Sequence, residues 1–184
     1  MTKRNVEEFK DLNRNPITNC GVTVGLVNEG CYDDWRITLL APKDTPYKNG
    51  LFYLNIHFPE DYPKSAPEVY FITPIYHVNV NPCAPKAKGD ESLGHVCIST
   101  LNWWKPEKRM RQVLLDIYSL FYMANPNSAY GLSRAKEYNK EREVYEEKIK
   151  YFTKKYADPN KAINMNLKYD RDRDKDWDFN LSIK

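Results

Sequence analysis

The sequence has no long hydrophobic run, few cysteines and little net charge. No stretch approaches the roughly 18 consecutive apolar residues of a membrane-spanning helix, and the first residues show no apolar signal region. The formal net charge of +3 is too small to indicate nucleic-acid binding. We therefore expect neither a membrane nor a nucleic-acid partner.

The four cysteines follow no regular spacing, which fits reduced thiols better than a disulfide framework. They are Cys20, Cys31, Cys83 and Cys97. Thiols stay reduced inside cells, so we expect a cytoplasmic or nuclear protein, or one found in both.

The chain of 184 residues is long enough for one domain with a buried core, and its 41% hydrophobic and 29% charged content is ordinary for a globular protein. We expect a core over residues 1–157 and an extension over 158–184. Residues 170–178 of the extension alternate acidic and basic side chains around Trp177. This pattern predicts a solvated, partly disordered tail, with a docking segment as the alternative.

The hydrophobic pattern changes period along the chain, from two in the first half to that of a helix in the second. It predicts strands over residues 22–27, 35–39, 52–58 and 69–72, at intervals that suit an antiparallel meander. It predicts helices over 2–13, 108–123, 131–139 and 141–156, the first capped by Thr2 with Val6, Phe9 and Leu12 on its inner face. Strands followed by helices indicate an α+β domain.

Three short motifs follow in order after the last predicted strand. They are Tyr76-His77-Val78-Asn79, Gly94-His95-Val96-Cys97-Ile98-Ser99 and Trp103-Trp104-Lys105-Pro106. Their order, His-x-Asn, Gly-x-x-Cys and Trp-x-Pro, resembles the ubiquitin-conjugating enzymes, and the resemblance extends over roughly residues 3–157. It implies that family's fold: a helix, a four-stranded meander, an active-site segment and three helices.

The resemblance assigns the chemistry to Cys97, which would carry ubiquitin's C-terminal carboxyl group as a thioester. Asn79 matches an asparagine that is credited with holding the oxyanion or with shaping the nearby loop. His77 matches a histidine that acts structurally by hydrogen bonding within its turn. Val78 stands where the family has proline, and the loss of proline's fixed φ predicts a looser turn.

Two further positions near the thiol depart from the usual pattern. Ser128 aligns with an aspartate that positions or helps to deprotonate the incoming lysine, and a hydroxyl would contribute only orientation and desolvation. Tyr130 stands where a leucine often gates the site. His95 lies two residues before Cys97, on the same side of an extended segment, but we interpret it as a surface histidine.

Partner surfaces are also implied by the resemblance. The first helix of the family docks on the activating enzyme, which assigns that role to Lys3, Arg4 and Lys10. Lys64 and Pro106 fall in the two loops that face a RING or HECT ligase. Trp103 and Trp104 are interpreted as core residues or as a shelf under the active-site segment.

The spacing between Asn79 and Cys97 is roughly ten residues longer than is usual in the family. Long loops beside an active site are often functional, and Lys86 and Lys88 are candidate self-modification sites there, as Cys83 is a candidate second thiol. The order of cysteines and histidines in residues 77–97 matches no familiar zinc pattern, so we expect no metal.

The sequence therefore predicts a ubiquitin-conjugating enzyme that needs no cofactor, with ATP consumed by the activating enzyme. Its partners would be ubiquitin, the activating enzyme, a ligase and protein substrates. The alternatives are a carrier of a ubiquitin-like modifier, or a silent relative that only scaffolds a ligase or another conjugating enzyme. A cysteine protease finds no support in the order of strands and helices.

Overall fold

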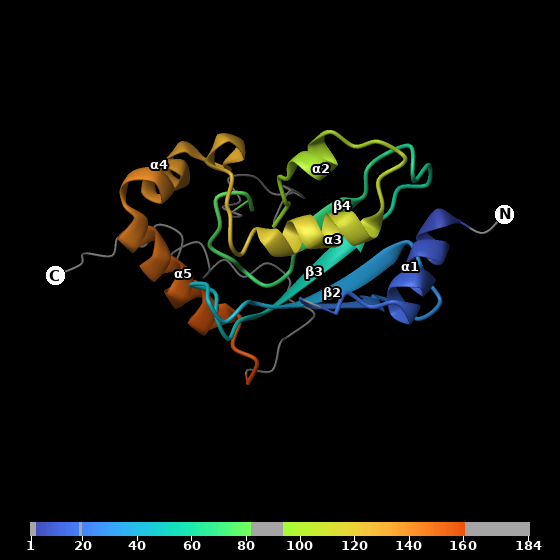
Figure 1. Ribbon diagram of the computed structural model, residues 1–184, viewed down its shortest axis with the longest axis horizontal. Coiled ribbons are helices and arrows are strands. Elements are labelled where there is room, and N and C mark those ends of the chain that lie inside the picture. Colours follow the sequence, from blue (N-terminus) through green and yellow to red (C-terminus); the bar gives the residue numbers. More distant parts are fainter. Residues whose placement is uncertain (1–2, 19, 82–93, 161–184) are drawn as a thin grey trace, which may run out of the picture.

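The computed structural model describes residues 3–18, 20–81 and 94–160, and its elements follow the predicted order (Figure 1). Helices, one of them a single 3-10 turn, precede and follow one four-stranded sheet. The elements are α1 (Arg4–Arg14), β1 (Gly21–Leu26), β2 (Asp34–Leu40), β3 (Leu51–His57), β4 (Glu68–Phe71), α2 (Ser99–Asn102), α3 (Met110–Ser119), η1 (Pro126–Ser128), α4 (Leu132–Lys140) and α5 (Arg142–Tyr156).

The sheet is an antiparallel meander in the order β1-β2-β3-β4, as the sequence pattern predicts. Alternate residues of its two central strands are fully buried, and those between them face the other side. The buried set is Trp35, Ile37 and Leu39 in β2, and Phe52, Leu54 and Ile56 in β3. One apolar face of the sheet therefore forms the floor of the core.

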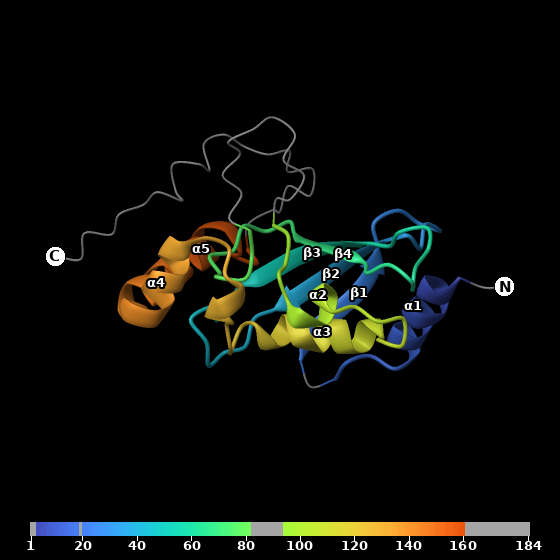
Figure 2. The ribbon, with the colours of Figure 1, turned by 90° about the horizontal axis from the view of Figure 1, so that it is seen from above.

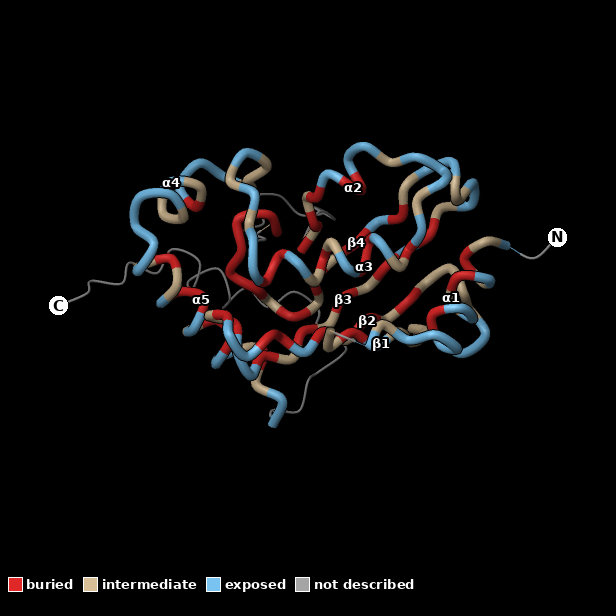
Figure 3. Tube along the Cα trace, viewed as in Figure 1, coloured by how far each residue is buried: buried red, intermediate tan, exposed pale blue. Residues whose placement is uncertain are grey.

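Helix α3 lies across this apolar face, and the remaining helices flank it (Figures 1 and 2). Val113, Leu114 and Ile117 of α3 are buried on the sheet side. Helix α1 packs at one end of the sheet, and α4 and α5 lie at the other end. Residues 75–80 are all buried, and along β2 and β3 the burial trace alternates between buried and less buried positions (Figure 3).

The structure corrects several details of the prediction. Helix α1 begins at Arg4 with Lys3 at its N-cap position, so the predicted cap by Thr2 is wrong. The helix expected over 108–123 is shorter, because α3 spans only Met110–Ser119 and residues 120–122 form turns after it. The short elements α2 and η1 were not predicted, since three or four residues are too few for a periodic pattern to appear.

The inner face of α1 is more polar than predicted. Leu12 is buried and Phe9 packs edge-on against Trp35 at 5.4 Å between ring centroids. The other buried residues are Asn5 and Glu8, in place of the predicted Val6, which is only half-buried. Buried polar side chains need partners, and both have them, as described below.

Several expectations concern residues outside the described part of the chain. They are the alternating segment at 170–178, the candidate thiol Cys83, and Lys86 and Lys88. Among the described residues, no helix combines the length and apolar character needed to cross a bilayer.

Candidate active site

Two extended segments lie side by side and carry the candidate thiol. The N–H of Cys97 donates to the carbonyl oxygen of Asn79 at 2.8 Å, and a β-bridge pairs Val80 with Val96. The Cys97 side chain is half-buried. These contacts fix the backbone of the thiol against the preceding turn.

The surroundings of Gly94 explain why the first position of the Gly-x-x-Cys motif is a glycine. Its φ of 74° lies in the left-handed region, and a Cβ there would be 2.2 Å from the carbonyl oxygen of Phe71. The N–H of Phe71 donates to the Gly94 carbonyl at 2.9 Å. Only glycine lets the chain pass this close to β4 and then extend toward Cys97.

His77 is buried and hydrogen-bonds within its turn. Its Nδ1 accepts the N–H of Asn79 at 2.9 Å, and its Nε2 donates to the carbonyl oxygen of Leu120 at 3.0 Å. Burial lowers the pKa of His77 to about 4. The ring is therefore neutral near pH 7 and occupied on both nitrogens, which suits a structural role.

Val78 makes a backbone hydrogen bond that a proline at this position could not make, because proline has no N–H. Its N–H donates to the hydroxyl of Tyr145 at 3.1 Å, and its carbonyl accepts the N–H of Tyr130 at 2.7 Å. Both groups are part of a fully buried residue. These bonds hold the turn, so the predicted loosening is offset.

Arg134 clamps the same turn from helix α4. It is 5% exposed, and its Nη1 donates to the carbonyl oxygens of His77 and Val80, both at 3.2 Å. Its guanidinium lies 4.6 Å from the ring centroid of Tyr76. Nothing in the sequence pattern indicates this role, because an arginine in a charged helix usually faces solvent.

Asn79 is fully buried, and its side-chain amide hydrogen-bonds the loop at residues 125–128. Its Nδ2 donates to the carbonyl oxygens of Asn125 at 2.8 Å and of Ser128 at 2.9 Å, and its Oδ1 accepts the N–H of Asn125 at 2.8 Å. An amide has only two N–H groups. Both are occupied here, which favours loop shaping over the oxyanion role.

Ser128 is half-buried at the end of η1, in the loop that Asn79 holds. Its hydroxyl accepts a long hydrogen bond of 3.4 Å from Nδ2 of Asn125. Asn125 caps η1 by accepting the N–H of Asn127 through its side chain. The loop is thus ordered by asparagine side chains, as turn chemistry predicts.

The thiol itself has a partner that the sequence did not indicate. Nδ2 of Asn102, the last residue of α2, lies 3.2 Å from Sγ of Cys97 in a donor geometry. The two residues are five apart. This spacing brings them together only because a single helical turn follows the extended segment.

His95 and Tyr130 form a pair beside the thiol, which corrects the interpretation of His95 as a surface residue. The hydroxyl of Tyr130 lies 2.6 Å from Nδ1 of His95, and both residues are half-buried. Burial lowers the pKa of His95, which favours the neutral ring. Burial, and then the negative charge of a Cys97 thiolate, raise the pKa of Tyr130.

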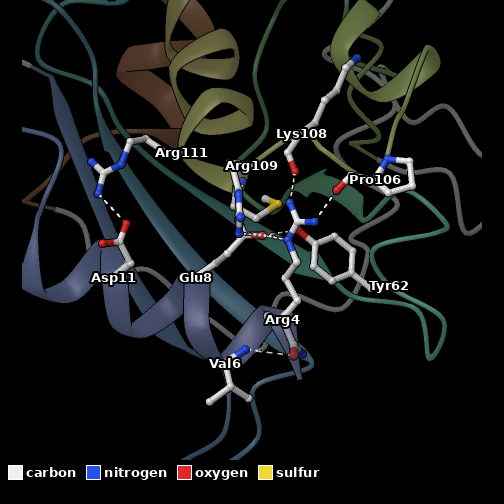
Figure 4. Close-up of polar contacts among 11 residues, drawn as sticks. Arg4, Val6, Glu8, Asp11, Tyr62, Pro106, Lys108, Arg109 and Arg111 are labelled. Carbon is white, nitrogen blue, oxygen red and sulfur yellow. Dashed lines mark hydrogen bonds and ion pairs between the residues drawn. The ribbon is translucent and has the colours of Figure 1, made fainter. Parts of the chain in front are cut away.

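Glu8 joins α1 to the start of α3 (Figure 4). Its Oε2 accepts the N–H of Met110 at 2.6 Å, and its Oε1 accepts Nε of Arg4 at 2.6 Å and the hydroxyl of Tyr62 at 3.0 Å. Met110 is the first residue of α3, whose N–H groups lack partners within the helix. Glu8 therefore caps α3 from another helix.

Arg4, which the resemblance assigns to the surface for the activating enzyme, uses its guanidinium for contacts within the chain. Its side chain is 19% exposed, and its guanidinium also donates to the carbonyl oxygens of Pro106 and Lys108 (Figure 4). Lys3 and Lys10 are exposed. The free basic surface of α1 is thus smaller than expected.

The two predicted ligase-facing positions lie on neighbouring loops. Lys64 and Pro106 are both exposed. Their loops are joined by Trp104, whose Nε1 donates to the carbonyl oxygen of Pro63 at 2.8 Å. Trp104 is half-buried as predicted, but Trp103 is 75% exposed, so its interpretation as core or shelf is wrong.

No metal ligand set appears in the described residues. Within them, no three histidine, cysteine, aspartate or glutamate side chains gather closely enough to hold an ion. All three histidines of the chain are described, and none hydrogen-bonds Cys97.

Comparison with known proteins identifies this arrangement. The sequence profile described as "Ubiquitin-conjugating enzyme" matches residues 4–153. Among solved structures, the ubiquitin-conjugating enzyme E2 domain of a Toxoplasma gondii protein is similar with a TM-score of 0.69 and 27% identity, over 84% of this chain and 97% of that one. The chain belongs to the ubiquitin-conjugating enzyme family.

Proposed function

We propose that the protein accepts ubiquitin from an activating enzyme as a thioester on Cys97 and passes it to a lysine amine or a ligase cysteine. The observation that carries the proposal is the position of Cys97. A half-buried thiol lies on an extended segment that a backbone hydrogen bond joins to Asn79, and the side-chain amide of Asn102 is its hydrogen-bonding neighbour.

Loading exchanges one sulfur for another. The Cys97 thiolate attacks the thioester carbonyl on the activating enzyme, a new C–S bond forms, and the activating enzyme's thiolate leaves. This step needs no general base beyond loss of the thiol proton to solvent. The absence of a histidine bonded to Cys97 among the described residues is compatible with it.

Transfer forms an amide bond in place of the thioester. The lysine nitrogen attacks the carbonyl carbon, the C–S bond breaks, the Cys97 thiolate leaves, and the nitrogen loses a proton to solvent. Ser128 and Tyr130 lie on the loop held by Asn79. We assign them to orienting the amine, since neither hydroxyl is an ionised base near pH 7.

The partner surfaces are assigned from membership of the ubiquitin-conjugating enzyme family and from which side chains are exposed. Lys3 and Lys10 of α1 would face the activating enzyme, and Lys64, Pro106 and the exposed Trp103 would face a ligase of RING or HECT type. We place the reaction in the cytoplasm or nucleus, because thiols stay reduced in these compartments. ATP would be consumed by the activating enzyme, with no cofactor on this chain.

A cysteine protease is disfavoured by the bonds of the histidines. Such an enzyme pairs its thiol with an activating imidazole, yet His77 is buried in its turn and His95 bonds Tyr130. Carriage of a ubiquitin-like modifier remains the alternative within the family.

A discharge assay tests the proposal. The protein is charged with activating enzyme, ATP and ubiquitin, activation is stopped with a chelator, and free lysine is added. The proposal predicts a reductant-sensitive adduct one ubiquitin heavier that decays faster as lysine increases. If neither ubiquitin nor any ubiquitin-like modifier with its own activating enzyme gives an adduct, the scaffold function replaces the enzyme function.

A further inference from the structure

The tetrahedral intermediate of thioester transfer places negative charge on the former carbonyl oxygen, and this charge needs a hydrogen-bond donor. The amide of Asn79 has no free N–H, because both bind the carbonyl oxygens of Asn125 and Ser128. Releasing them would take the Asn79 donor from both loop carbonyls, and the Asn125 carbonyl would keep only the N–H of Ser128 at 3.1 Å. The oxyanion donor must therefore be sought elsewhere around Cys97.

Asn102 offers a donor at the reacting atom. Its Nδ2 lies 3.2 Å from Sγ of Cys97, its side chain is exposed, and among the described residues its amide has no other partner. The carbonyl oxygen of a thioester is two bonds from the sulfur. A donor in contact with the sulfur thus reaches that oxygen by a small side-chain rotation.

The short helix α2 fixes Asn102 at this place. The hydroxyl of Thr100 donates to the carboxylate of Asp116 on α3, and Nζ of Lys108 donates to the carbonyl oxygens of Thr100 at 2.9 Å and Trp103 at 2.7 Å. The backbone on both sides of Asn102 is anchored. Only its side-chain torsions are free, so little ordering is needed when the thioester forms.

We propose that Asn102 is the oxyanion donor of this protein, an inference that rests on the proposed thioester function. When the amine attacks, the carbonyl π electrons move to oxygen, which accepts one N–H of Asn102. When the intermediate collapses, the C=O bond re-forms, the C–S bond breaks, and the leaving thiolate accepts the amide N–H that contacts Sγ. The amine proton goes to solvent.

The test measures single-turnover discharge of the ubiquitin thioester on Asn102→Ala, Asn102→Asp and Asn102→Gln, with lysine and with hydroxylamine as acceptors. Loss of one oxyanion donor slows reactions by about 10²–10³ in enclosed sites. For this exposed amide we expect about tenfold with Asn102→Ala, more with the carboxylate of Asn102→Asp, and partial recovery with Asn102→Gln. An oxyanion donor acts on the carbonyl, so both acceptors should slow equally.

Asn28→Ala is the matched control, since Asn28 is an exposed asparagine in the turn between β1 and β2. It should discharge at the rate of the unsubstituted protein, and thermal melts should show that each Asn102 variant is folded. Unchanged discharge of Asn102→Ala overturns the inference, and so does slowing with lysine alone, which would make Asn102 an acceptor-orienting residue. If the unsubstituted protein forms no thioester, both the proposed function and this inference are wrong. If Asn102→Ala forms the thioester and discharges it at the rate of the unsubstituted protein, only the inference is wrong.

Discussion

The carboxylate of Glu8 accepts the backbone N–H of Met110 at 2.6 Å across 102 residues of sequence. The first helix thus caps the helix that covers the sheet. The same carboxylate holds Arg4 and Tyr62, with its side chain 7% exposed. Three parts of the chain meet at this one group.

Replacing Glu8 should destabilise the fold. Glu8→Ala removes the acceptor of Nε of Arg4 and of the N–H of Met110, while the Arg4 guanidinium keeps the carbonyl oxygens of Pro106 and Lys108. We expect a loss of about 3 kcal/mol in the free energy of unfolding, the lower end of the cost of breaking a buried ion pair. Glu8→Gln keeps an acceptor and should lose about 1–3 kcal/mol. Urea denaturation measures both, with the exposed Glu7→Gln as control, expected within about 0.5 kcal/mol. Equal stability of all three variants would contradict the capping role.

The hydroxyl of Tyr145 should contribute to stability because it accepts a hydrogen bond from the N–H of Val78. Tyr145→Phe keeps the ring but leaves a buried donor without an acceptor, at a cost of about 1–3 kcal/mol in unfolding free energy. Tyr122→Phe removes a hydroxyl from a residue that is 51% exposed and should cost little. Matching denaturation midpoints for the two variants would show that the turn does not depend on this bond.

Stability should decline in mild acid because of His77. Its folded pKa of about 4 lies below the ordinary value of 6.5, so between these values the unfolded chain binds the proton and the folded chain does not. The contribution of His77 to the free energy of unfolding is fully present above pH 6.5 and is lost as pH falls toward 4. In this window the free energy of unfolding changes by up to about 1.4 kcal/mol per pH unit. Burial also lowers the pKa of His95, which adds in the same direction.

Denaturation at pH 7, 6 and 5 measures this slope. The variant His77→Gln should be less stable at pH 7 yet show a flatter dependence on pH in this window. A slope unchanged by the substitution would assign the acid sensitivity to other groups.

Tyr130 should affect transfer to lysine more than loading. Its hydroxyl hydrogen-bonds Nδ1 of His95 at 2.6 Å, and whichever group donates, the hydroxyl oxygen keeps a lone pair that can accept an N–H of the incoming amine. Tyr130→Phe should form the thioester normally but discharge to lysine about threefold to tenfold more slowly, as expected for one hydrogen bond of about 0.5–1.5 kcal/mol. Discharge to hydroxylamine serves as the comparison; equal slowing with both acceptors would contradict an amine-orienting role.

The fold was predictable where one periodic pattern decides the structure. The alternation of Phe52, Leu54 and Ile56 predicted β3 and its buried face, and Tyr145, Ile149 and Phe152 predicted the buried side of α5. These patterns follow from burial of one face of each element. The meander then follows from the short connections between strands.

The polar contacts between residues far apart in the chain were not predictable, unlike the local hydrogen bond of His77 within its turn. No local pattern distinguishes the buried Glu8 from the exposed Glu7 beside it, or indicates that Arg134 would point inward to His77. The motif marked Asn79 and Cys97, but the amide at the thiol belongs to Asn102. That contact depends on a helical turn too short to show a pattern.

A non-reducing gel of the protein charged with ubiquitin, beside Cys97→Ser, Cys97→Ala and single alanine variants of the other cysteines, tests the central claim most directly. The account predicts a reductant-sensitive adduct on the unsubstituted protein, a reductant-resistant oxyester on Cys97→Ser and no adduct on Cys97→Ala. Alanine at Cys20, Cys31 or Cys83 should leave the thioester intact. An adduct that persists in Cys97→Ala, or disappears in one of these three, would contradict the assignment of the carrier thiol to Cys97.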